Sequence, residues 1–192
     1  MLLTIKEQHK QIRERIATGA VRTLKEYIAS KEDESLRYHR FNQVLLRKNK
    51  KVNAKVLKSS PTVLTITNDK GCSFSTAFST VSPRRIRNFN EEWFEDSGIQ
   101  ISCSSGTTTF ITDHALKRAF ERALWVFKDK PVEEWIGLFD NTDTLIWSTI
   151  SKTKLKPDQT CTIEGDVLNA VVQAGSNDIL TVLSYVHPTK KV

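Results

Sequence analysis

The spacing of the apolar residues changes along this chain, and the order of those changes limits what it can fold into. Two N-terminal segments, residues 3–30 and 35–48, carry apolar side chains at near-helical intervals. Strand-type residues then dominate residues 51–58, 62–68 and 73–81, which are rich in Val, Ile, Thr and Phe. Helical spacing returns after position 111, and strand-like spacing closes the chain. Separate runs of helix and strand predict an α+β fold.

Turn and breaker residues set the expected element boundaries in the N-terminal part. The polar run Lys31-Glu32-Asp33-Glu34-Ser35 separates the two expected helices, and Gly19 is a possible break within the first. Asn68-Asp69-Lys70-Gly71 predicts a hairpin turn between two short strands, and residues 82–88 form a basic loop in this reading. We therefore expect N-terminal helices followed by short β-hairpins.

The sequence of the C-terminal part predicts two helices packed on an antiparallel sheet. Short strands at 99–103 and 107–111 form a hairpin that leads into a helix opening at Thr112 or Asp113. A second helix starts at Pro131, a favoured first-turn residue, and ends at Asn141-Thr142-Asp143. Strands follow at 144–151, 167–174 and 178–186, with a loop over 152–165. The expected division is residues 1–106 as a basic helical and β region and residues 107–192 as an α+β domain.

The positive charge of the chain is concentrated near its N-terminus. Residues 1–60 hold 15 Lys and Arg against 6 Asp and Glu, whereas residues 61–192 hold 14 against 16. This asymmetry favours a polyanionic partner, most simply nucleic acid, although a basic helix could also keep the protein soluble or dock an acidic protein. The candidate nucleic-acid-binding residues are Arg37, Arg40, Arg47, Lys48, Lys50, Lys51, Arg84 and Arg85. Arg84 and Arg85 could equally pair with the acidic residues just downstream.

The helix expected after Thr112 carries the clearest chemical pattern. His114, Arg118 and Arg122 recur every four residues and so share one helical face. A histidine at a helix N-terminus is favoured in its neutral form, which can act as a general base near pH 7. Two guanidinium groups on the same face can bind phosphate oxygens. The alternative is a solvated face of an amphipathic helix.

One segment of the chain resembles the opening motif of small toxin-like ribonuclease domains of the barnase, EndoU, colicin and RelE-like group. This segment is Thr112-Asp113-His114-Ala115-Leu116-Lys117-Arg118-Ala119-Phe120-Glu121-Arg122. The final strand, Ile179-Leu180-Thr181-Val182-Leu183-Ser184, is similar to the last strand of that group, with Leu183 where a tyrosine is frequent. The resemblance covers residues 107–187. It implies metal-independent RNA cleavage, with His114 as acid or base, Arg118 and Arg122 as phosphate binders, and Thr181 and Ser184 facing the scissile phosphate.

The chemistry of RNA cleavage is consistent with this set of residues. Attack by the ribose 2′-hydroxyl needs a base, an acid and cations that stabilise a pentavalent phosphorane, and DNA lacks that hydroxyl. The acidic residues nearby show no metal-ligand spacing, so we expect neither metal nor cofactor. His187 and Tyr185 are candidates for the second proton-transfer group.

Several other classes of protein are disfavoured by the sequence. Gly-rich phosphate loops, dinucleotide-binding fingerprints and nucleophile elbows are missing, and no apolar run reaches membrane-spanning length. Three widely spaced cysteines favour a reducing, cytoplasmic setting.

The alternatives to a ribonuclease with an RNA partner are a non-catalytic nucleic-acid-binding or regulatory protein, such as a phage or mobile-element factor, and a protein-interaction or inhibitor module. The sequence leaves the oligomeric state and any neutralising or target protein open.

Overall fold

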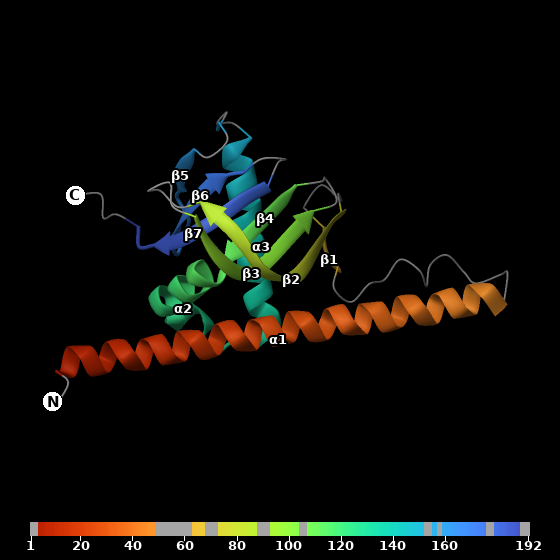
Figure 1. Ribbon diagram of the computed structural model, residues 1–192, viewed down its shortest axis with the longest axis horizontal. Helices are drawn as coiled ribbons and strands as arrows, with labels where there is room; N and C mark the ends of the chain where they lie inside the picture. The colour runs from red at the N-terminus through yellow and green to blue at the C-terminus, as the bar shows by residue number, and fades with distance from the viewer. Residues whose placement is uncertain are drawn as a thin grey trace.

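The computed structural model describes residues 4–48, 63–67, 73–87, 93–103, 107–151, 155–156, 159–175 and 179–188. These residues form an α+β fold, as predicted, with helices packed against one sheet (Figure 1). The helices are α1 (Ile5–Lys48), α2 (Asp113–Phe127) and α3 (Val132–Ile150). The strands are β1 (Val63–Thr67), β2 (Ser73–Arg87), β3 (Trp93–Cys103), β4 (Thr108–Thr112), β5 (Thr160–Ile163), β6 (Asn169–Ala174) and β7 (Ile179–Val186).

All seven described strands belong to one sheet with the order β1-β2-β3-β4-β7-β6-β5. Neighbouring strands are antiparallel except β4 and β7, which run parallel with Thr108 opposite Ile179 and Ile111 opposite Val182. The expectation of a purely antiparallel sheet was therefore wrong, because the two-helix connection between β4 and β7 lets them run parallel. The predicted hairpins of β1 with β2 and of β3 with β4 are confirmed, and β6 also pairs with β7. The boundary expected after residue 106 lies between β3 and β4, so the sheet continues across it.

Local capping explains why α2 begins where the sequence predicts. Thr112 ends β4, and its hydroxyl oxygen accepts a hydrogen bond from the backbone N–H of Ala115 at 3.0 Å. This is the usual way in which a residue before a helix satisfies one of the free amides of the first turn. The same hydroxyl donates to the carbonyl oxygen of Val182 at 3.3 Å, so the cap is tied to β7.

The main core lies between the helices and one face of the sheet. Ala115, Leu116 and Phe120 of α2 are buried against Ile111 and Val182 of the two parallel strands. The aromatic rings of α2 and α3 add edge-on and stacked contacts, with centroids 4.7–6.1 Å apart, among Phe120, Phe127, Trp135 and Phe139. Such ring pairs add to the stabilisation that burial of their surface provides.

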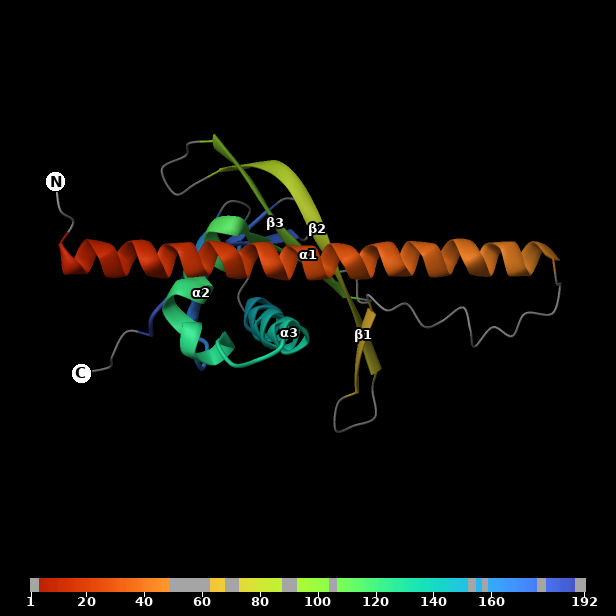
Figure 2. The ribbon, with the colours of Figure 1, turned by 90° about the horizontal axis from the view of Figure 1, so that it is seen from below.

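Helix α1 packs against this body through its N-terminal half and then continues past it (Figures 1 and 2). Its buried residues are Ala17, Val21, Leu24 and Ile28. Polar contacts hold the same segment in place. Lys25 donates to the Asp113 carboxylate at 2.8 Å, and Lys117 forms an ion pair with Glu14 at 2.8 Å. The start of α2 is therefore attached to α1 as well as to the sheet.

Two expectations about helices were wrong. The two N-terminal helices are one helix of 44 residues. The charged run at positions 31–34 is compatible with helix, and the burial of Ala17, Val21 and Leu24 on either side of Gly19 outweighs the cost of about 1 kcal/mol that glycine adds. The strand expected over 144–151 is the last part of α3. There the burial of Ile146 and the hydrogen bond from Trp147 to Thr109, at 2.8 Å, outweigh the strand preference of the residues.

Two expectations about strands were also wrong. The basic loop expected over 82–88 is strand as far as Arg87, where β2 resumes pairing with β3 after a register shift between Val81 and Arg84. The loop expected over 152–165 contains β5, which pairs with β6 at the edge of the sheet. The strand expected over 51–58 lies outside the described residues. No described helix is long and apolar enough to cross a bilayer.

We predict that Gly98→Ala lowers the free energy of unfolding by about 2–3 kcal/mol, because overpacking a close contact carries a cost of this size. A Cβ atom at Gly98 in β3 would overlap the carbonyl oxygen of Ile111 in β4. The matched control is Gly137→Ala on α3, where a Cβ meets nothing, and we expect it to stabilise by about 0.5–1 kcal/mol. Urea denaturation of both variants checks this prediction, and equal stability of the two would contradict it.

Candidate functional site

The parallel pairing of β4 with β7 brings two histidines to one edge of the sheet. Adjacent parallel strands end at the same edge, which is where residues from different strands can meet. Helix α2 begins directly after β4 and places His114 in its first turn. His187 follows directly after β7. The two imidazoles come from distant parts of the sequence and line the same groove.

This groove has a volume of about 660 Å³ and lies between α1, α2 and the residue that follows β7. We call it the basic groove. Its lining is made of charged residues and histidines: Lys10, Arg13 and Glu14 from α1, His114, Lys117, Arg118, Glu121 and Arg122 from α2, and His187. Five cationic side chains against two carboxylates make the lining positive, so it is complementary to an anion.

Ion pairs and hydrogen bonds position three of the cations. Arg118 forms an ion pair with Glu121 at 2.7 Å, on the same helix. Lys117 is held by Glu14 of α1, and Arg122 donates a hydrogen bond to the backbone carbonyl oxygen of Tyr185 in β7. Each of these interactions uses only part of the N–H donors of the Lys or Arg side chain, so the remaining donors can bind phosphate oxygens.

The environment of His114 favours the neutral imidazole. Partial burial and the nearby charge of Arg118 lower the pKa of His114 below its usual value of 6.5, while the Asp96 carboxylate opposes this effect. Asp96 also accepts a hydrogen bond from the backbone N–H of His114 at 3.2 Å. The pKa of Asp96 is itself raised, chiefly by burial and in part by the charge of Asp113. His114 is therefore ready to accept a proton near pH 7.

The structure brings together His114, Arg118 and Arg122 as the sequence predicted, but it places Thr181 elsewhere. Thr181 lies in the middle of β7, opposite Phe110 of β4 and Gln173 of β6, and directly opposed residues share a face of the sheet. Phe110 packs with Leu183 and Val81, separately from the core that α2 covers. The expectation that Thr181 faces the same phosphate as His114 was wrong, because strand alternation turns it to the opposite face.

The predicted nucleic-acid-binding residues fall in three places. Arg37, Arg40, Arg47 and Lys48 are on α1, in the part whose side chains are not described, and Lys50 and Lys51 lie outside the described residues. Arg84 and Arg85 are in β2, where the strand register places them opposite Asp96 and Glu95.

Sequence reasoning missed the contribution of α1 to the groove. Lys10 and Arg13 are three positions apart, so they can lie on the same face of a helix, and that spacing was visible in the sequence. The packing of that face beside α2 was not visible. His187 was only a candidate, because its place beside His114 depends on the pairing of β4 with β7.

No group of three or more His, Cys, Asp or Glu residues within the described ranges is placed to hold a metal ion. No protein-family model, curated protein or solved structure compared with the chain matches it. The geometry of the groove is therefore the basis for inferring the function of the protein.

We predict that NMR titration gives His114 a pKa below 6.5. Arg118→Gln should move this pKa upward, because it removes a cation that disfavours the imidazolium. Asp96→Asn should move it downward, because it removes the carboxylate that favours the imidazolium and still leaves an acceptor for the backbone N–H. The signal is assigned with His114→Gln. Shifts of the opposite sign would contradict the assigned electrostatics.

Proposed function

We propose that the protein is a metal-independent endoribonuclease whose reacting groups lie in the basic groove. The observation that carries this proposal is that two imidazoles, those of His114 and His187, and two guanidinium groups, those of Arg118 and Arg122, line one positively charged groove. Imidazole is the side chain best suited to move protons near neutral pH, and guanidinium binds phosphate in a bidentate manner.

Each histidine has a separate role in this proposal. Neutral His114 takes the proton of the ribose 2′-hydroxyl as the 2′-oxygen attacks the adjacent phosphorus. His187 donates a proton to the departing 5′-oxygen as its bond to phosphorus breaks. The products are a 2′,3′-cyclic phosphate and a free 5′-hydroxyl, and the two proton transfers balance. The lowered pKa of His114 supports its role as the base.

The cations of the groove act on the phosphate. Arg118 and Arg122 lie one and two turns after His114 on the same face of α2, where they can stabilise the negative charge that develops on the phosphorane. Glu121 restricts the guanidinium of Arg118, and the Tyr185 carbonyl restricts that of Arg122. Lys10 and Arg13 on α1 add positive charge to the lining of the groove, and in this proposal they bind neighbouring phosphates of the strand.

The chemistry and the charge both favour RNA as the substrate. A general base beside a phosphate can activate the ribose 2′-hydroxyl of RNA as an internal nucleophile, whereas DNA has no such hydroxyl. The basic N-terminal part of the sequence includes α1, which lines the groove and continues beyond the body of the protein (Figure 1). A basic surface of this kind attracts a polyanion before any specific contact forms.

We predict that the purified protein cleaves RNA but not single-stranded DNA in the presence of EDTA. His114→Ala and His187→Ala should each lower the cleavage rate by about 10²–10⁴-fold, the size of a general acid or base contribution. Neither residue belongs to the hydrophobic core, so the thermal unfolding midpoint should change little. His9→Ala, an exposed histidine on α1 that does not line the groove, is the matched control.

Two results would overturn the proposal. Cleavage that persists in both groove variants would place the chemistry elsewhere or in a contaminant. Intact RNA with the folded wild-type protein, together with salt-dependent RNA binding in a shift assay, would favour a non-catalytic nucleic-acid-binding protein.

A further inference from the structure

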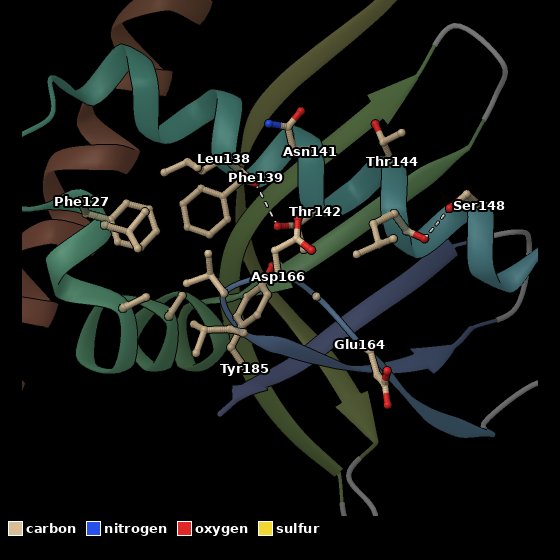
Figure 3. Close-up of a pocket in the computed structure, with 17 residues that line it drawn as sticks. Phe127, Leu138, Phe139, Asn141, Thr142, Thr144, Ser148, Glu164, Asp166 and Tyr185 are labelled. Atoms are coloured by element: carbon tan, nitrogen blue, oxygen red, sulfur yellow. Dashed lines mark hydrogen bonds between the residues drawn. The ribbon is translucent and has the colours of Figure 1, made fainter. Parts of the chain in front are cut away.

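We propose that a second cavity, between α2, α3 and the segment that leads into β6, is a binding site for a small hydrophobic amine. It has a volume of about 500 Å³, within the range of small-molecule sites (Figure 3). It shares no lining residue with the basic groove among the residues that the structure describes. This inference is independent of the proposed ribonuclease activity.

The walls of the cavity are largely apolar. Phe127 of α2 and Leu138, Phe139 and Leu145 of α3 supply aromatic and branched surface. Phe127 and Phe139 stack with a centroid distance of 5.8 Å and 19° between their planes, which gives the cavity a flat aromatic end. Such walls bind an alkyl or aryl group and release the water around it.

Tyr185 provides a buried polar group in this apolar setting. Its ring extends from β7 toward α3 and lines the cavity (Figure 3). The residue is 3% exposed, and its hydroxyl has no hydrogen-bond partner among the described residues. A buried hydroxyl without a partner costs free energy, and a ligand that supplies a partner would recover it. By contrast, the hydroxyls of Thr142 and Ser148 donate to helix carbonyls at 2.9 Å.

The charges around the cavity favour a cationic ligand. Its lining residues include the exposed, acidic Glu164 and Asp166 and, among the described residues, no lysine, arginine or histidine. The buried Asp143 also acts on Tyr185: burial first, and then the charge of Asp143, raises the pKa of the Tyr185 hydroxyl well above its usual value. The hydroxyl therefore stays neutral and can accept a hydrogen bond, and the negative field at its position favours an ammonium group.

The binding test uses the full chain and three probes with one carbon skeleton: 4-phenylbutylamine, 4-phenylbutanol and 4-phenylbutyrate. Isothermal titration calorimetry should give the amine an affinity at least tenfold higher than that of the alcohol and of the carboxylate. Tyr185→Phe should weaken amine binding about tenfold, because it removes only the hydroxyl.

A second variant tests the location of the site. Leu145→Trp enlarges a residue that is 36% exposed and lines the cavity, so it should abolish binding without loss of the fold. Ile5→Trp, a similar change at an exposed position of α1, is the matched control and should bind as the wild type does. Three results would overturn the proposal. They are failure of the amine to bind, tighter binding of the carboxylate than of the amine, and unchanged amine affinity in both Tyr185→Phe and Leu145→Trp. RNA cleavage plays no part in these outcomes.

Discussion

The parallel pairing of β4 with β7 is the constraint on which the rest of the structure depends. It joins strands that are far apart in the sequence and makes one sheet from the first four strands, β1 to β4, and the last three, β5 to β7. Because the connection between them passes through α2 and α3, it also places these helices where they cover the sheet. The same pairing sets the two strand ends side by side, which brings His114 and His187 to one groove.

Helix α2 links the groove, the core and the second cavity. One of its faces carries His114 and the arginines, while Ala119 and Ala123 line the cavity on another side. The helix is distorted at Ala123, where φ is −121° and ψ is 29°. Arg122, next to this distortion, donates to the carbonyl oxygen of Tyr185, whose ring lies in the cavity. Tyr185 therefore contributes its backbone carbonyl to the groove and its ring to the cavity.

The sequence predicted features that short-range physics determines. The start of α2 follows from the Thr112 cap, and the face shared by His114 and Arg118 follows from helical geometry. Features set by distant contacts were not predictable. Residues 144–150 have strand propensity but are helical because of their packing, and Thr181 was assigned to the wrong face because its strand partners were unknown. The part played by α1 in the groove could not be inferred for the same reason.

The most direct test of the central claim uses an oligonucleotide that is 2′-deoxy throughout except for one ribonucleotide. If His114 and His187 act together on a 2′-hydroxyl, the protein in EDTA should cut this strand only on the 3′ side of that ribose. Mass spectrometry should then find a 2′,3′-cyclic phosphate on one product and a 5′-hydroxyl on the other. Cleavage at deoxyribose positions, or a 5′-phosphate on the product, would contradict the account.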